Sequence, residues 1–426
     1  MMHRSTIVLS LVAFAAGCSD PASTPADDGG SSSGAASSSS GDGGSSSAAT
    51  TAVDSSGGTS TGTDDGGSSS TTGEPPAPWV WDLPPGFPEP YVPAQNPMSA
   101  EKVELGRHLF YDLRLSGNGT QSCASCHDQA RGFADGLPTP QGSTGSVLAR
   151  NSMGLTNSVY SYPLTWANPN LVDLEHQILV PLFGEFPIEL GAVGHEDEIL
   201  QRLRDEPVYG PLFEAAFPER DDPFSFDAVR DALACFTRTL ISGDSPYDRF
   251  VYGDGELSES ALRGMNLFFS EAVECHHCHG SFNFSMSVKH ANTVFDPQAF
   301  HNTGLYNVGG TGAYPLGNEG LYESTALDTD RGRFRAPTLR NVAVSGPYMH
   351  DGSIATLEEV LDTYAAGGRN VTEGPFAGDG RANPYKSGFV GGFEMSPQDR
   401  DDLLAFLHSL TDETFLGDPR FANPWP

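Results

Sequence analysis

The chain has 426 residues, enough for two or three domains, and 38% of them are hydrophobic. It carries 55 Asp and Glu against 23 Lys and Arg, which gives a formal net charge of −32. So acidic a chain excludes a general nucleic-acid binder, which needs a basic face for phosphates, and argues against docking to anionic lipid through a basic patch.

The first 18 residues have the pattern of a bacterial lipoprotein signal peptide. A basic start is followed by a short apolar run at residues 7–16, the order typical of an export signal. The small residues before Cys18 resemble a lipobox, in which that cysteine is lipidated and becomes the mature N-terminus. The alternative is an ordinary signal peptide cleaved nearby. In both cases we expect export to the periplasm or to the periplasmic or outer-membrane face, with membrane attachment only through a lipid on Cys18.

Two segments of low complexity follow the signal. Residues 19–78 are rich in Ser, Gly, Thr and Asp and almost lack large apolar side chains, which predicts a disordered linker. Residues 79–97 are rich in Pro and aromatic residues. We expect them to form an ordered strap without regular structure.

The folded body, from residue 98 to the end, is predicted to be mainly α with long irregular loops, and it contains an internal repeat. A Gly-x-x-Leu-Phe segment begins at Gly106 and again at Gly264, and a Cys-x-x-Cys-His motif follows each copy. This duplication predicts two related domains, at residues 98–250 and 251–426.

Capping residues and apolar periodicity predict the helices of this body. Ser, Thr or Ser-Pro pairs mark several starts, and we expect residues 293–325 to form a long irregular loop. The expected helices are 99–111, 196–204, 226–240, one beginning at Ser258, one from Thr356 to about 366, and one beginning at Ser396.

The two Cys-x-x-Cys-His motifs are typical of c-type haem attachment, in which the cysteines form thioethers and the histidine binds iron. A redox dithiol or a zinc site is the rival interpretation, but neither explains a histidine directly after each cysteine pair. The residues concerned are Cys123, Cys126 and His127 in the first motif and Cys275, Cys278 and His279 in the second.

Three other residues near these patterns receive no redox role. Cys235 lies within a predicted helix and is expected to be a buried small hydrophobe. His276 and His277 lie between the cysteines of the second motif, and we expect them to point to solvent.

Residues 333–342 (RFRAPTLRNV) and 346–353 (GPYMHDGS) resemble the signature of the bacterial di-haem cytochrome c peroxidase and MauG family. The similarity extends over about residues 98–410. Within the family, residues 301–307 and 411–415 resemble the MbnH branch, MauG relatives that act on a small copper-binding protein. The resemblance implies two cytochrome c-like domains, the first with a high-spin peroxidatic haem and the second with a low-spin haem.

The family's redox residues correspond to three positions of this chain. Tyr364, fourteen residues after His350, would be the second ligand of the second haem, as in MauG, where conventional peroxidases have Met. A core aromatic on the same helix is the alternative. Glu189 would be the distal carboxyl that moves protons during peroxide cleavage. Trp166 would lie between the haems and pass electrons.

The resemblance also implies a calcium site and an open first haem. Asn151 and the backbone carbonyls of Ser345 and Pro347 would bind Ca²⁺. Ser143 stands where conventional peroxidases often carry a histidine that caps the first iron. We therefore expect the first haem to be open or water-bound in the oxidised protein, without reductive activation.

The main hypothesis is a MauG/MbnH-type peroxidase. It would use hydrogen peroxide to form a high-valent di-haem state and then oxidise a side chain, expected to be Trp, of a small exported metal-binding protein. One alternative is a conventional cytochrome c peroxidase, whose acidic surface would attract a small basic cytochrome c donor. Another is a non-catalytic electron-transfer lipoprotein.

Overall fold

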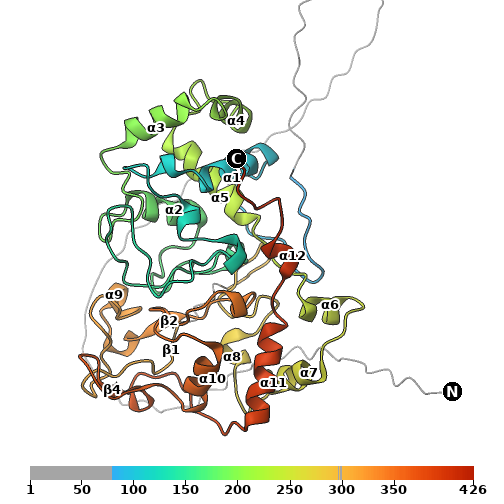
Figure 1. The fold of residues 1–426 in the computed structure, drawn as a ribbon, viewed down its shortest axis with the longest axis vertical. Helices are drawn as coiled ribbons and strands as arrows, with labels where there is room; N and C mark the ends of the chain where they lie inside the picture. The colour runs from blue at the N-terminus through green and yellow to red at the C-terminus, as the bar shows by residue number, and fades with distance from the viewer. Residues whose placement is uncertain (1–78, 296, 298–299) are drawn as a thin grey trace, which may run out of the picture. The chain divides into compact units, whose positions relative to one another are not determined.

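The computed structural model describes residues 79–295, 297 and 300–426 (Figure 1). The predicted signal peptide, the linker and Cys18 lie outside these residues. The described chain is mainly helical with long loops, as predicted. In this part of the chain no helix is both long and apolar enough to cross a bilayer.

Several helices begin at the capping residues predicted from the sequence. Ser99 Oγ accepts a hydrogen bond from the Lys102 amide at the start of α1, and Ser258, Thr356 and Ser396 act in the same way at later helices. The first half contains α1 (Ala100–Phe110), α2 (Leu174–Phe183), α3 (Glu196–Asp205), α4 (Tyr209–Ala216) and α5 (Phe226–Arg238). The second half contains α6 (Pro246–Tyr252), α7 (Glu259–Phe268), α8 (His276–His279), α9 (Tyr322–Thr325), α10 (Leu357–Ala365), α11 (Pro397–His408) and α12 (Glu413–Leu416).

Strands and single 3₁₀ turns shape the loops between these helices. β1 (Phe300–Asn302) pairs antiparallel with β2 (Arg333–Arg335), and β3 (Asn370–Val371) pairs with β4 (Gly378–Asp379). Residues 293–325 were expected to be irregular throughout, but they contain β1 and α9. The 3₁₀ turns are Leu113–Leu115, Cys123–Ser125, Gln129–Arg131, Ser158–Tyr160, Asp328–Asp330, Val342–Val344 and Gly380–Ala382.

The internal repeat corresponds to two crossed helix pairs. In the first half α1 packs against α5, and in the second half α7 packs against α11 (Figure 1). The repeated glycine lies at each crossing. A Cβ on Gly106 would come within 2.0 Å of the Ala232 carbonyl oxygen, and one on Gly264 within 1.8 Å of the Asp402 carbonyl oxygen. The glycines therefore allow a backbone approach that no larger residue permits.

Each half has its own apolar core, but the end of the chain joins the first. Phe415 and Phe421 are buried among the side chains of α1, α4 and α5, and Trp425 packs against the same core. The Trp425 Nε1 donates to the His108 carbonyl at 3.1 Å, and Gln129 Nε2 donates to the Phe415 carbonyl at 3.1 Å. The C-terminal tail thus completes the core of the first half, although the two are far apart in the sequence.

A buried polar network joins the two halves. Asn341 accepts a hydrogen bond from the Asp412 amide at 2.8 Å and donates to Ser242 Oγ at 3.1 Å. The Asp412 carboxylate accepts from the same Ser242 hydroxyl at 2.9 Å, while Asn157 accepts from the Ser242 amide at 2.7 Å. Asn341 and Asp412 belong to two of the segments on which the resemblance rests, 333–342 and 411–415, so part of that resemblance is structural.

Residues 79–97 contain no helix or strand and contact both halves. The Phe87 ring lies 6.0 Å from that of Tyr160 and 5.0 Å from that of Phe282. Asn96 is buried and donates from Nδ2 to Glu175 at 2.7 Å. The segment is therefore held by aromatic packing and hydrogen bonds.

Candidate functional site

The first Cys-x-x-Cys-His motif begins in the short turn Cys123–Ser125 and places a neutral histidine in the interior. His127 Nδ1 donates to the Phe133 carbonyl at 2.8 Å. Burial lowers the pKa of His127, which favours the neutral ring. Because Nδ1 carries the proton, Nε2 keeps the lone pair that binds iron.

The second motif repeats this arrangement in α8. His279 Nδ1 lies 3.1 Å from the Pro337 carbonyl oxygen and 3.3 Å from that of Phe284. Burial lowers its pKa to about 4. Both motif histidines are thus fixed in the tautomer that an iron ligand requires.

A cavity of about 220 Å³ is lined by the second motif and by Tyr364. Cys275, Cys278 and His279 contribute to its lining, together with apolar side chains of α10 such as Leu361. Burial is the main cause of the raised pKa of Tyr364, and the nearby Cys278 adds to it. The cavity therefore contains the predicted ligand pair, His279 and Tyr364, in an apolar surrounding.

Three side chains with ring or guanidinium nitrogens line this cavity: Arg335, His301 and His350. Arg335 is buried and donates to the Leu164 and Thr165 carbonyls, and no carboxylate of the described chain pairs with it. Burial lowers its pKa to about 10. His301 Nε2 and His350 Nε2 are buried without a hydrogen-bond partner among the described residues. A guanidinium without a carboxylate and two ring nitrogens without a partner suit the propionate groups of a haem.

Trp166 lies on the same cavity and is linked to the first motif. Its Nε1 donates to the Asn151 carbonyl at 2.9 Å. The adjacent Ser152 donates from Oγ to the Cys126 carbonyl at 2.6 Å. One short segment therefore contacts the first motif and the tryptophan that lines the second motif's cavity.

The three residues predicted to bind calcium also line this cavity. Asn151 donates from Nδ2 to the Leu137 carbonyl at 2.8 Å, which leaves Oδ1 as its possible ligand atom. The Ser345 hydroxyl bonds to the Val342 carbonyl at 3.3 Å, so its own carbonyl is the relevant donor. Asn151, Ser345 and Pro347 thus line one cavity and carry oxygen donors of the kind that Ca²⁺ takes.

Glu189 belongs to a loop that is fixed close to the first motif. Its carbonyl accepts from the Ser143 amide at 2.7 Å, and the Ser143 hydroxyl donates to the Leu190 carbonyl at 3.2 Å. Burial raises the pKa of Glu189. Burial first, and then the charges of Asp135 and Glu189, raise the pKa of the Cys126 thiol to about 11. Glu189 is thus within electrostatic range of the first motif, with Ser143 beside it.

Comparison with known proteins agrees with this arrangement. The family model for di-haem cytochrome c peroxidase matches residues 100–256. The methylamine utilization protein MauG of Methylorubrum extorquens is 34% identical over 325 residues, 75% of this chain and 81% of that protein. The cytochrome c551 peroxidase of Pseudomonas aeruginosa is 30% identical over 317 residues, 74% of this chain and 80% of that protein. The chain belongs to the di-haem cytochrome c peroxidase and MauG family.

A solved structure gives a further likeness. The crystal structure of a MauG-like protein associated with microbial copper homeostasis is 51% identical, with a TM-score of 0.81, and the match covers 82% of this chain and 100% of that one. The present protein is therefore a di-haem peroxidase, an oxidoreductase whose family carries two haem c groups. The tautomers of His127 and His279, and the buried Arg335 that has no carboxylate partner in the described chain, fit those groups.

Two charged residues of the di-haem site were missed by the sequence analysis. Arg335 lies within the family signature but received no role, although a charged residue among apolar neighbours is a usable signal. Asp135 has no such signal. Its Oδ2 is buried without a partner among the described residues, and burial is the main cause of its raised pKa. Cys235, by contrast, is fully buried in α5, as predicted.

Proposed function

We propose that this di-haem peroxidase is of the MauG/MbnH type and oxidises a side chain, Trp in our proposal, of a protein partner by long-range electron transfer. The observation that carries the proposal is that Tyr364, where a conventional peroxidase has Met, lines one cavity with His279. A phenolate oxygen stabilises oxidised iron, whereas Met raises the reduction potential. This difference favours storage of oxidising equivalents over relay of electrons from a donor.

The chain's own residues have three tasks in this proposal. When bound, the haems would supply the iron chemistry that takes up two oxidising equivalents from hydrogen peroxide. In the overall reaction, hydrogen peroxide, two electrons and two protons give two water molecules. Glu189 accepts a proton from one peroxide oxygen and returns it to the leaving oxygen. Trp166 offers an aromatic path between the two motifs. The partner supplies both electrons without entering the site.

We further propose that the partner is a small exported metal-binding protein. The support is the 51% identity to a MauG-like protein associated with microbial copper homeostasis. The sequence pattern at residues 1–18 supports export and a lipid anchor on Cys18, which would hold the enzyme where such a partner is found. Replacement of Cys18 by Ser, followed by cell fractionation, tests the anchor.

A calcium ion held by Asn151, Ser345 and Pro347 completes the proposal. All three line the cavity that Trp166 also lines, and the Asn151 carbonyl accepts the Trp166 indole hydrogen bond. An ion there would fix the position of the indole between the motifs. Metal analysis of the haem-loaded protein before and after chelation tests for it.

A conventional cytochrome c peroxidase is the second candidate. The 30% identity to cytochrome c551 peroxidase and the net charge of −32 favour it, because an acidic protein attracts a basic cytochrome. This alternative predicts that peroxide is consumed only with a reduced cytochrome c and that no partner side chain is altered.

The test is a single-turnover reaction of the fully ferric, haem-loaded protein with hydrogen peroxide and a candidate partner. We expect mass spectrometry to find an oxidised Trp in the partner without any added reductant. Glu189→Gln should abolish this product. Glu185→Gln, an exposed carboxylate four residues earlier in the same loop, is the matched control and should retain it. Peroxide consumption that requires prior half-reduction and leaves the partner unchanged would contradict the proposal.

A further inference from the structure

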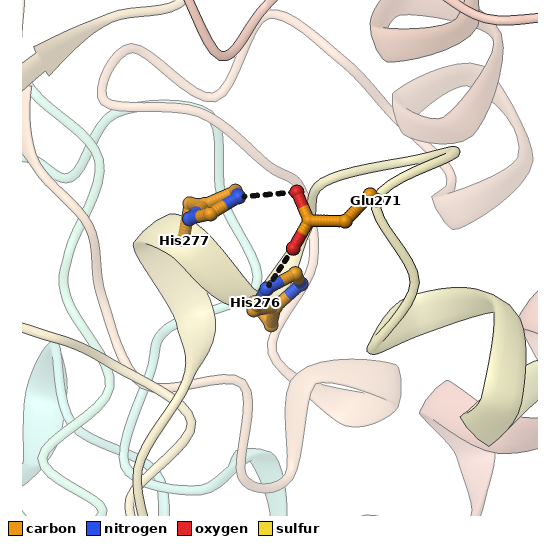
Figure 2. A group of neighbouring side chains, drawn as sticks. All are labelled: Glu271, His276 and His277. Carbon is orange, nitrogen blue, oxygen red and sulfur yellow. Dashed lines mark hydrogen bonds and ion pairs between the residues drawn. The ribbon is translucent and has the colours of Figure 1, made fainter. Parts of the chain in front are cut away.

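Two histidines and a glutamate converge next to the second motif, outside the di-haem site (Figure 2). His277 Nε2 lies 3.2 Å from one Glu271 carboxylate oxygen, and His276 Nε2 lies 3.5 Å from the other. One ligand atom from each residue lies within 4.8 Å of the other two. Figure 2 shows both rings turned toward the single carboxylate.

The expectation that both histidines point to solvent is confirmed only in part. Their side chains are 24% and 29% exposed, and both contact Glu271, whose side chain is 77% exposed. His277 stacks on Phe389, with ring centroids 4.5 Å apart and planes inclined by 17°. His276 Nδ1 is buried without a hydrogen-bond partner among the described residues, so Nε2 is the ring atom left for a ligand. Both rings are therefore held before any ligand arrives.

We propose that Glu271, His276 and His277 form a binding site for a divalent late transition metal ion, with Cu²⁺ bound most tightly. Ligand bonds of about 2.0–2.2 Å from imidazole and carboxylate require donor atoms about as close together as these. Imidazole nitrogen selects copper, zinc or nickel over calcium and magnesium, which take oxygen ligands. Among these ions, Cu²⁺ has the highest affinity for a given set of nitrogen and oxygen donors. Water would complete the coordination, because Glu271 is exposed.

The site lies beside the second haem-binding motif. His276 and His277 lie between Cys275 and Cys278, and Phe389, on which His277 stacks, lines the second motif's cavity. The site itself does not depend on the proposed function, since it rests only on these three side chains.

The experiment is a calorimetric titration of haem-loaded, chelator-treated protein with Cu²⁺, repeated with Zn²⁺. We expect one Cu²⁺ per chain, and copper-edge X-ray absorption, which the haem iron does not disturb, should show two imidazole ligands. Glu271→Gln and His277→Gln should each weaken Cu²⁺ binding by about tenfold or more. Both variants retain Cys275, Cys278 and His279, so an unchanged haem absorption spectrum reports that the motif is intact.

His176→Gln is the matched control. His176 forms an exposed pair with Asp173 at 2.8 Å, and no second histidine joins this pair in the described chain. Its replacement should leave Cu²⁺ affinity unchanged. Equal affinity of the wild type, Glu271→Gln and His277→Gln would overturn the metal site, as would a copper spectrum without imidazole. Either result would leave the peroxidase proposal untouched, because peroxide-dependent partner oxidation is measured separately.

Discussion

Gly106 lies so close to the Ala232 carbonyl that a Cβ at this position would come within 2.0 Å of the oxygen. The obstacle is backbone, which cannot rotate away as a flexible side chain would. We expect Gly106→Ala to lower the free energy of unfolding of the haem-loaded protein by about 1–3 kcal/mol, measured by denaturant titration. A Cβ on Gly210 in α4 would have no other atom within 4 Å. Gly210→Ala should therefore raise the free energy of unfolding by about 0.5–1 kcal/mol. Equal effects of the two substitutions would refute the close crossing.

The buried ion pair between Arg340 and Asp248 should contribute strongly to stability. The guanidinium donates to both carboxylate oxygens, at 2.8 and 2.9 Å, and the side chains are 1% and 4% exposed. Arg340→Met leaves a buried, unpaired carboxylate and should cost about 3–5 kcal/mol in denaturant unfolding. Adding Asp248→Asn should restore much of the loss, since it removes that charge while the amide oxygen can still accept from Ser245.

A surface pair provides the comparison for this prediction. Arg249 and Asp244 are 2.6 Å apart, but their side chains are 53% and 54% exposed. Arg249→Met should therefore change stability by less than about 1 kcal/mol. If Arg340→Met lowered the free energy of unfolding by as little as Arg249→Met, the buried ion pair could not be formed as described.

Tyr364→Phe tests the phenolic oxygen as a haem ligand. The substitution keeps the ring that packs in the apolar cavity and removes only the oxygen donor. The fully ferric wild type should give one high-spin and one low-spin EPR signal, and the variant should lose or shift the low-spin signal. Tyr322→Phe is the control. Tyr322 belongs to α9, its ring packs against the Arg331 guanidinium, and it does not line the cavity. An unchanged low-spin signal in Tyr364→Phe would show that another group binds the second iron.

The raised pKa of Glu189 should appear in the pH dependence of the peroxide reaction. Because burial disfavours the carboxylate, Glu189 stays protonated to a higher pH than an exposed glutamate. Only the ionised form accepts the peroxide proton, so the rate should rise with pH through this raised pKa and fall as acid is added. Stopped-flow mixing of the ferric protein with peroxide at a series of pH values measures this rate.

Two variants make this pH prediction specific. Glu189→Gln should remove the pH step and slow the reaction by about 10²–10⁴-fold. Asp135→Asn is the control, since Asp135 is the other carboxyl near Cys126 with a raised pKa. It should retain the step. Loss of the step in Asp135→Asn alone would move the proton-transfer role from Glu189 to Asp135.

Local features of this protein could be predicted from sequence because their causes are local. Ser99, Ser258, Thr356 and Ser396 were expected to cap helices, and each accepts an amide hydrogen bond at a helix start. The Cys-x-x-Cys-His motifs likewise carry their chemistry within five residues. The family resemblance then identified Glu189, Trp166 and Tyr364, and the structure places the last two on one cavity.

Features that depend on the path of loops could not be predicted. Nothing in the sequence indicates that Glu271 folds over His276 and His277, because the approach depends on how residues 271–275 turn before α8. The burial of Arg335 against backbone carbonyls depends on a segment about 170 residues away in the chain. The packing of Phe415 on Phe133 also joins distant segments, and apolar periodicity does not specify partners.

The tail that packs on α1 and α5 determines when the protein can finish folding. Synthesis makes the first haem motif early, whereas Phe415, Phe421 and Trp425, which belong to or pack against the same core, follow about 290 residues later. The core of the first half therefore cannot be completed until the second half has been made.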